Sequence, residues 1–237
     1  MVWIACILSA YIVGSIPFGV ILGRLKGIDI LQHGSRNPGA TNVMRVLGKP
    51  FGYACFVLDV SKGAIPTIMA GFLNEVINRP PHELTQGQML LWLAVPVAAV
   101  LGHMFSIFLG FKGGKGVATG FGSLAAMWPL LTIPTFCAVV VWYFLLRTTK
   151  YVAVASIGAA FGIPLAYLLS VVPNDLENMV PTVLHASPPF WVTGIIACLV
   201  LYQHRTNLGR IRRGEEPQAG GAARRGKILS EKKTETE

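Results

Sequence analysis

Apolar residues in this chain gather into long blocks that short polar segments separate. The blocks cover approximately residues 2–23, 52–73, 88–109, 117–146, 151–172 and 188–203. An α-helix needs about 20 apolar residues to cross a hydrocarbon core of about 30 Å. Because the blocks lie near or above this length, the pattern predicts an all-α polytopic membrane protein.

The fourth block, residues 117–146, is longer than one span, and Trp128-Pro129 interrupts it. An internal proline is compatible with one long kinked helix or with two shorter ones. Charge placement separates these alternatives, because loops rich in Lys and Arg tend to stay on the cytoplasmic side. Two helices put every basic loop on one side of the membrane and every acidic loop, including 173–187, on the other. We therefore predict about seven transmembrane helices, with the N-terminus outside and the C-terminus cytoplasmic.

Composition supports this class, since 53% of the residues are hydrophobic and 13% are charged, whereas soluble domains carry about 25% charged residues. The net charge of +9 lies in loops and at the C-terminal end, so it indicates membrane topology and attraction to anionic lipids. We do not expect nucleic acid as a partner. Disulfides and metal sites are not expected either, because all four cysteines lie within apolar blocks: Cys6, Cys55, Cys137 and Cys198.

The C-terminal segment has too few apolar residues to bury a core. From about Gly214 it is rich in Gly, Ala, Lys, Glu and Arg, which is typical of disorder. We predict an integral-membrane domain over residues 1–213 and a disordered cytoplasmic tail over residues 214–237.

Two glycine-rich loops, residues 34–42 and 110–119, have the chemistry of a phosphate site. Glycines let backbone amides converge on an anion, and Lys or Arg supplies the opposite charge. A short helix from Ala40 to Leu47 would put the hydroxyl of Thr41 and the guanidinium of Arg45 on one face, because the two residues are four positions apart. The second loop does not match the Walker A pattern, which argues against nucleotide hydrolysis. Its remaining interpretation is a loop whose backbone amides bind phosphate at the start of a helix near Val117. The side chains that could bind anions are Ser35, Asn37, Thr41, Asn42, Arg45, Lys112 and Lys115.

A third polar group ends the last apolar block, where His204, Asn207 and Arg210 recur about once per helical turn. This stripe can be a binding face or an ordinary juxtamembrane cluster of basic residues. Asp59 and Lys62 lie inside the second block, where a charge is costly. They can pair with each other, or one of them can face a cytoplasmic cavity and orient a residue of the phosphate site.

Other features leave alternatives open or exclude reactions. His103 can be a capping or packing residue, or a catalytic one. The chain has no Gly-x-Ser-x-Gly, His-Glu-x-x-His or His-x-x-x-x-Asp string. A covalent nucleophile, a metal centre and a cofactor are therefore not expected.

Six motifs in order resemble the bacterial integral-membrane glycerol-3-phosphate acyltransferases that use acyl phosphate as donor. They are Gly14-Ser15-Ile16-Pro17-Phe18-Gly19, Gly34-Ser35-x-Asn37-x-Gly39-Ala40-Thr41-Asn42-x-x-Arg45, Leu58-Asp59-x-x-Lys62-Gly63, Gly102-His103-x-Phe105, Phe111-Lys112-Gly113-Gly114-Lys115-Gly116-Val117-Ala118-Thr119 and His204-Arg205-x-Asn207. The match covers essentially residues 1–216. Arg36 and Ser106 replace an expected glycine and proline, and the segment 74–87 and the tail are longer than expected.

The resemblance implies transfer of a fatty acyl group from acyl phosphate to the 1-hydroxyl of sn-glycerol 3-phosphate. The products would be 1-acyl-sn-glycerol 3-phosphate (lysophosphatidic acid) and phosphate, in the first step of phospholipid biosynthesis. It also implies a multi-pass protein of the bacterial cytoplasmic (inner) membrane, with its active site on the cytoplasmic face and an upstream enzyme that forms acyl phosphate. No cofactor or metal is implied.

The residue roles follow from the resemblance and the local chemistry together. As catalytic residues we expect Ser35, Lys115, His204 and Asn207; as substrate-binding residues we expect Arg45, Asn37, Thr41, Asn42, Lys112, Gly113, Gly114, Arg205 and Lys62. The acyl-phosphate head would lie on Lys115, Ser35 and the backbone amides of the two glycines. Glycerol 3-phosphate would lie on Arg45, His204 and Asn207.

The base and one rival function stay open at this stage. Either His204 or a phosphate oxygen of the donor can accept the hydroxyl proton, and we favour the phosphate, with His204 as a positioning residue. The rival is a carrier for an anionic metabolite such as a phosphate ester. A carrier predicts midplane polar groups and an internal repeat, whereas here the polar groups cluster at one face and no repeat is visible.

Overall fold

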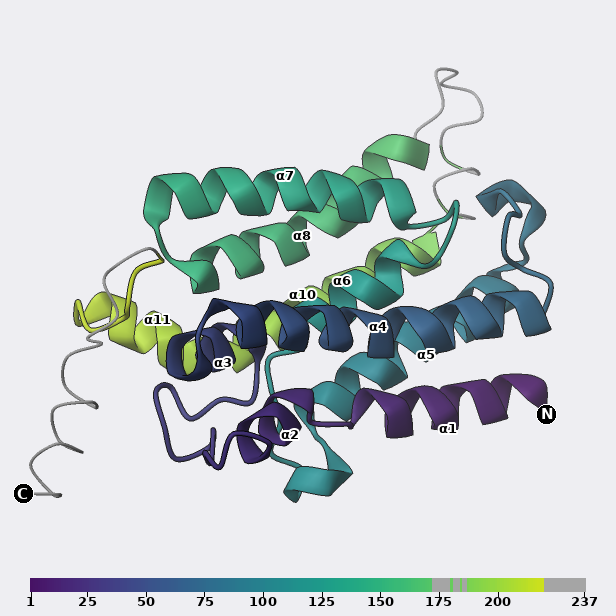
Figure 1. Ribbon diagram of the computed structural model, residues 1–237. Helices are drawn as coiled ribbons and strands as arrows, with labels where there is room; N and C mark the ends of the chain where they lie inside the picture. Colours follow the sequence, from purple (N-terminus) through teal and green to yellow (C-terminus); the bar gives the residue numbers. More distant parts are fainter. Residues whose placement is uncertain (172–179, 181–183, 185–186, 220–237) are drawn as a thin grey trace, which may run out of the picture.

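The computed structural model describes residues 1–171, 180, 184 and 187–219, and all regular elements in these ranges are helices (Figure 1). Five segments are long and apolar enough to cross a membrane: Val2–Arg24, Lys49–Leu73, Gln86–Leu109, Thr132–Thr149 and Val152–Val171. They hold 18 to 25 residues, which at 1.5 Å per residue gives about 27–38 Å, enough for a hydrocarbon core of about 30 Å. The prediction of an all-helical membrane protein is confirmed.

The chain forms α-helices joined by short loops and two single-turn 3₁₀ helices. In chain order they are α1 (Val2–Gly14), α2 (Phe18–Arg24), α3 (Ala40–Leu47), α4 (Lys49–Leu73), η1 (Pro81–Glu83), α5 (Gln86–Met104), η2 (Ile107–Leu109), α6 (Val117–Ala125), α7 (Thr132–Thr149), α8 (Val152–Val171), α10 (Ser187–Gln203) and α11 (Arg205–Arg212).

The first apolar block is broken into α1 and α2 at Ser15–Pro17. Pro17 has no amide hydrogen and disfavours a helical conformation in the residue before it, so the helix ends there. α1 lies so close to α5 that a Cβ on Gly14 would lie 2.3 Å from the carbonyl oxygen of Ala99. The break therefore occurs in a helix whose position is fixed by tight packing.

The fourth apolar block forms two helices, α6 and α7, joined by a turn that contains Trp128 and Pro129. This confirms the prediction of two shorter helices over one long kinked helix. α6 packs against α4 through two glycines. A Cβ on Gly63 would lie 2.2 Å from the carbonyl oxygen of Thr119, and one on Gly122 would lie 2.1 Å from that of Val60.

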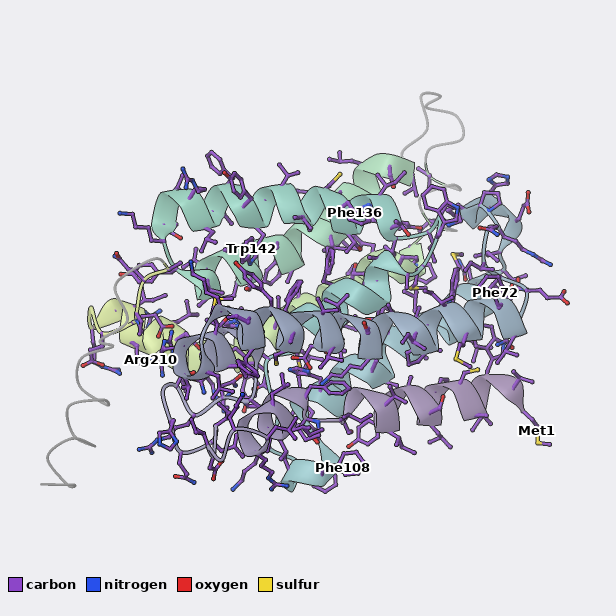
Figure 2. All side chains as sticks on the ribbon, viewed as in Figure 1. Met1, Phe72, Phe108, Phe136, Trp142 and Arg210 are labelled. Atoms are coloured by element: carbon purple, nitrogen blue, oxygen red, sulfur yellow. The ribbon has the colours of Figure 1, made fainter. Side chains whose placement is uncertain are left out.

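The remaining long helices, α7, α8 and α10, pack in sequence onto α5. α7 and α8 form an antiparallel hairpin, α8 packs on α10, and α10 packs on α5. The centre of the core lies on α5, where Trp92 and Leu93 are fully buried. Large apolar side chains such as Phe72, Phe108 and Phe136 are exposed on the outside of the bundle, as expected of surfaces that face lipid (Figure 2).

The loops that carry the predicted chemistry gather at one end of the bundle. α2, α3 and α11 lie at this end, and the N-terminus lies at the other (Figure 1). Arg210 accordingly lies at the end opposite Met1 (Figure 2). The acidic loop that helped to predict the topology, with Asp175 and Glu177, lies outside the described residues.

Candidate active site

The second glycine-rich loop folds back onto the end of α5. The amide of Gly113 donates to the carbonyl of Met104, and the amide of Gly114 donates to that of His103, each at 3.0 Å. The loop needs glycine here, because a Cβ on Gly114 would lie 2.1 Å from Nε2 of His103. Both amides, which were expected to bind phosphate, therefore have carbonyl partners in this arrangement of the loop. What the loop presents is the side chain of Lys115.

The ammonium of Lys115 donates a hydrogen bond to Oδ1 of Asn207, 92 positions later in the chain. Asn207 is 5% exposed and belongs to α11, and His204, 2% exposed, is the residue at which α10 gives way to α11. Nδ1 of His204 lies 2.8 Å from the carbonyl oxygen of Val200. A carbonyl only accepts, so Nδ1 carries the hydrogen and Nε2 of the neutral ring is left as an acceptor.

Burial and neighbouring charges set the protonation of this cluster. Burial, with the positive charge of Lys115 adding to it, lowers the pKa of His204 to about 4. Burial also lowers the pKa of Lys115 to about 8; Glu216 opposes this decrease, while Arg210 and Arg45 add to it. Near neutral pH the site therefore holds a neutral imidazole and a charged ammonium.

Glu216 is a member of this cluster that sequence reasoning missed. Its Oε1 accepts a 2.6 Å hydrogen bond from Nδ2 of Asn207, and its Oε2 lies 2.6 Å from Nε of Arg210. The amide of Ala219 also donates to the carbonyl of Lys150 between α7 and α8, at 2.8 Å. Residues 214–219, predicted to begin a disordered tail, thus lie against the bundle; residues 220–237 lie outside the described residues.

The first glycine-rich loop is held together by Asn42, which is buried. Its Oδ1 accepts from the amide of Ser35 at 2.7 Å, and its Nδ2 lies within 3.3 Å of the carbonyl oxygens of Ile30, His33 and Asn37. We expected Asn42 to bind substrate, but its side chain instead fixes the loop. The hydroxyl-bearing residues Ser35 and Thr41 are exposed, and Arg45 is half-buried.

Other predicted binding residues lie in different surroundings. Lys112 is exposed. Arg205 is also exposed, where it donates to the carbonyl of Tyr202 at 3.0 Å and stacks 4.1 Å from the centre of that ring. Oδ1 of Asn37 accepts from the amide of Gly39 at 2.9 Å and so supports the turn before α3.

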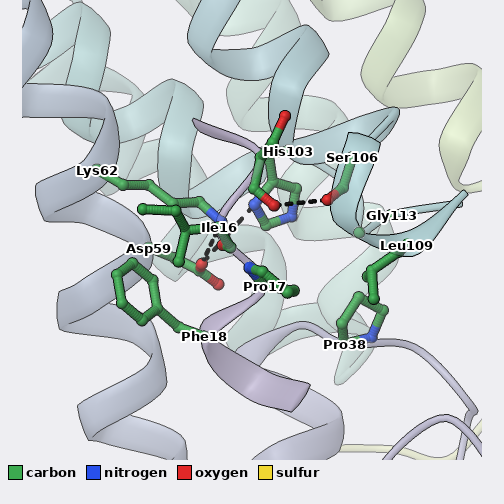
Figure 3. Close-up of a pocket in the computed structure, with 12 residues that line it drawn as sticks. Ile16, Pro17, Phe18, Pro38, Asp59, Lys62, His103, Ser106, Leu109 and Gly113 are labelled. Atoms are coloured by element: carbon green, nitrogen blue, oxygen red, sulfur yellow. Dashed lines mark hydrogen bonds and ion pairs between the residues drawn. The ribbon is translucent and has the colours of Figure 1, made fainter. Parts of the chain in front are cut away.

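Asp59 and Lys62 pair with each other, which is the first of the two alternatives that the sequence left open, and both also line a hollow beside the glycine-rich loops (Figure 3). Both are at most 3% exposed, and Nζ of Lys62 lies 2.8 Å from Oδ1 of Asp59. The same ammonium donates at 2.7 Å to the carbonyl of Ile16, in the break between α1 and α2. Lys62 was expected to bind substrate; in the structure its ammonium is held by the protein itself.

A small hollow lies beside this pair, with an empty volume of about 210 Å³ that includes open solvent. Nδ1 of His103 lies 3.0 Å from the hydroxyl of Thr119 and 3.8 Å from Asp59. Pro38 of the first glycine-rich loop and Gly113 of the second both line the hollow (Figure 3). The two loops therefore meet at one place. Within the described ranges, no three His, Cys, Asp or Glu side chains are grouped to hold a metal ion.

Comparisons with known proteins agree on one family. The family model described as glycerol-3-phosphate acyltransferase matches residues 4–214. A glycerol-3-phosphate acyltransferase of Acholeplasma laidlawii is 35% identical over 226 residues, covering 93% of this chain and 94% of the relative. A glycerol-3-phosphate acyltransferase of Synechococcus elongatus is 37% identical over 220 residues, covering 92% of this chain and 94% of the relative.

Solved structures give the same result. The crystal structure of PlsY (YgiH), an integral membrane glycerol 3-phosphate acyltransferase, matches in its glycerol 3-phosphate form with a TM-score of 0.75 and 33% identity. The match covers 92% of this chain and 96% of that one. The lysophosphatidic acid form matches with a TM-score of 0.74, at 33% identity over 92% and 95%.

Proposed function

We propose that this chain, which belongs to the glycerol-3-phosphate acyltransferase family, transfers a fatty acyl group from acyl phosphate to the 1-hydroxyl of sn-glycerol 3-phosphate. The products are 1-acyl-sn-glycerol 3-phosphate and inorganic phosphate. The observation that carries this proposal is the meeting of Lys115, Asn207 and neutral His204 at the end of the bundle where both glycine-rich loops lie.

The reaction needs alignment more than covalent catalysis. The hydroxyl oxygen attacks the acyl carbon, the bond from that carbon to the phosphate oxygen breaks, and the hydroxyl proton leaves for a base. An acyl phosphate already carries a good leaving group, so the protein has to hold two anions side by side and stabilise developing charge. This agrees with a site built from cations, amides and a neutral imidazole.

Lys115 and Ser35 hold the acyl-phosphate head in this proposal. Arg45, His204 and Asn207 bind glycerol 3-phosphate. The exposed groups Thr41, Lys112 and Arg205 and the half-buried Asn37 attract and orient the two anions at the rim. Asn42 and Lys62 support the site without binding substrate, because their polar atoms are already bonded within the protein. Asn42 holds the first glycine-rich loop, and Lys62 holds the break between α1 and α2. Gly113 and Gly114 likewise set the course of the loop that carries Lys115.

The donor phosphate accepts the hydroxyl proton in this scheme. A pKa of about 4 makes His204 a weak base at neutral pH, whereas an efficient catalytic base has a pKa near the working pH. The phosphate oxygens of the donor gain negative charge as the bond to the acyl carbon breaks, so they become better proton acceptors during the step itself. His204 then orients glycerol 3-phosphate through Nε2.

We propose seven spans, counting α1 with α2 as one and including the shorter α10 and the segment made of α6 and the turn that leads from it to α7. The N-terminus lies outside, and the C-terminus and the active site lie on the cytoplasmic face of the bacterial inner membrane. The gathering of basic loops at one end of the bundle supports this orientation. Residues 1–213 form the membrane domain, and an enzyme that makes acyl phosphate supplies the donor from the same face.

The test is a reaction in detergent with purified protein, a long-chain acyl phosphate and glycerol 3-phosphate. We expect release of phosphate and an equal amount of 1-acyl-glycerol 3-phosphate, identified by mass spectrometry. Leaving out glycerol 3-phosphate controls for hydrolysis of the donor. Absence of product, together with counterflow of glycerol 3-phosphate in proteoliposomes, would identify a carrier instead.

A further inference from the structure

Four polar side chains form a continuous chain of contacts beside the candidate active site. Nε of Arg210 and Nδ2 of Asn207 each donate to Glu216, both at 2.6 Å, and Oδ1 of Asn207 accepts from the ammonium of Lys115. Three of these residues come from α11 and the segment after it. The fourth, Lys115, comes from the loop between α5 and α6, so the chain joins two distant parts of the sequence.

The two charged neighbours fix which way the amide of Asn207 faces. A carboxylate only accepts hydrogen bonds, and an ammonium only donates them. With the amide reversed, its oxygen would face the carboxylate of Glu216 and its NH₂ group would face the ammonium of Lys115, so both contacts would be repulsive. Glu216 thus keeps the oxygen of Asn207 turned toward Lys115.

We infer that Glu216 is a positioning residue, which orients Asn207 and thereby holds the ammonium of Lys115 in place for the acyl-phosphate head. This assignment rests on the proposed function. Glu216 lies after residue 214, where the match to the family model ends, and inside the segment that the sequence predicted to be a disordered tail.

Burial separates Glu216 from an ordinary surface ion pair. The side chain of Glu216 is 9% exposed, and that of Arg210 is 30% exposed. The neighbouring pair, Glu215 with Arg213, has a similar N–O distance of 2.8 Å, but its side chains are 56% and 60% exposed. Exposed pairs contribute little because water and ions screen them, so Glu215 provides a matched control.

The charges around Lys115 determine how Glu216 acts on it. Arg45 from α3 and Arg210 from α11 favour loss of the ammonium proton, Glu216 opposes this loss, and His204 is neutral. Removing Glu216 leaves Lys115 among cations, so its proton will leave at lower pH. Removing Arg210 has the opposite effect, because Glu216 then acts on Lys115 without a competing partner.

The experiment compares the alkaline limb of kcat/KM for acyl transfer in three variants with that of the unmodified protein. The alkaline limb is the fall of kcat/KM as pH rises. Glu216→Gln should lower kcat/KM and shift this fall to a pH about one unit lower. Arg210→Gln should move it up, and Glu215→Gln should leave both unchanged. A purely structural role lowers the yield of folded protein without moving the limb. Unchanged limbs in Glu216→Gln and Arg210→Gln would therefore overturn the assignment.

Two further measurements keep the result decisive. Where Glu216→Gln does not fold, the double variant Glu216→Gln, Arg210→Gln, which leaves no unpaired charge, is compared with Arg210→Gln alone. A fall of kcat/KM at lower pH in the double variant supports the assignment, and a fall at the same pH in both refutes it. Acetylation of Lys115 as a function of pH, followed by peptide mass spectrometry, reports its titration without any turnover. Absence of product from the unmodified protein would refute the proposed function, and the acetylation profiles of the three variants would still test the role of Glu216.

Discussion

The ammonium of Lys62, in the middle of α4, donates a 2.7 Å hydrogen bond to the carbonyl oxygen of Ile16, 46 residues earlier in the chain. That carbonyl belongs to the break between α1 and α2, where the regular helical bonding stops and its backbone donor is the amide of Phe18 two residues on, at 3.2 Å. An unsatisfied backbone group inside a membrane costs several kcal/mol, so such breaks persist only where the protein supplies a partner. Because Asp59 neutralises the ammonium, the pair stabilises the broken helix beside the hollow.

Lys62→Met is expected to destabilise the protein by about 3–5 kcal/mol, because it leaves Asp59 buried without its partner. The double variant Asp59→Asn, Lys62→Met should lose less stability than Lys62→Met alone, since it leaves no buried charge without a partner. Thermal unfolding in detergent measures both, with exposed Lys49→Met as the control. A double variant less stable than Lys62→Met alone would contradict this account of the pair.

Gly63→Ala should weaken the contact between α4 and α6. The new methyl group would lie 2.2 Å from the carbonyl oxygen of Thr119, and overpacking of this kind typically costs about 1–3 kcal/mol. Gly194→Ala on α10 is the matched control, because a Cβ there meets nothing within 4 Å. It should be neutral or more stable by up to about 1 kcal/mol, the helix preference of alanine over glycine. Equal unfolding temperatures for the two variants would contradict the proposed close packing.

The helices could be predicted from sequence where the signal is local. The split of residues 117–146 follows from an internal proline and from loop charges, and the helix at Ala40–Leu47 follows from the Pro-Gly turn that precedes it. The length of each apolar block reflects the thickness of the bilayer. None of these signals depends on which helices become neighbours.

The partners of polar groups could not be predicted in the same way. Composition indicates that Asn42, Gly113 and Lys62 can bind an anion, but not whether another part of the chain already occupies their polar atoms. Glu216 shows the converse, since its segment is polar enough to resemble a disordered tail. Contacts with Asn207 and Arg210, which are set by the tertiary fold, nevertheless hold it in place.

Acyl transfer should depend on the charge of Lys115. Because burial lowers its pKa to about 8, the residue is an ammonium below that pH and a neutral amine above it. If the ammonium holds the donor phosphate, kcat/KM should be level near neutral pH and fall as pH rises through about 8.

The matched variants for this prediction are two arginine substitutions. Arginine keeps its charge to above about pH 12, so Lys115→Arg should remove the alkaline fall, even with a lower value at neutral pH. Lys49→Arg, at an exposed position at the start of α4, should leave the profile unchanged. The rate of donor hydrolysis without protein is subtracted at each pH. An alkaline fall that persists in Lys115→Arg would exclude Lys115 as its source.

His204→Ala separates the two candidates for the base. General-base catalysis contributes about 10²–10⁴-fold to turnover, so loss of a base would lower kcat by that factor. If the donor phosphate takes the proton and His204 only orients the acceptor, kcat should fall by less than about tenfold while KM for glycerol 3-phosphate rises, because one hydrogen bond to substrate is lost. His82→Ala, with an exposed side chain in η1, is the control. Abolished turnover with unchanged binding of glycerol 3-phosphate would assign the base to His204, and its Nε2, left as an acceptor by the bond from Nδ1 to Val200, would be the atom that receives the proton.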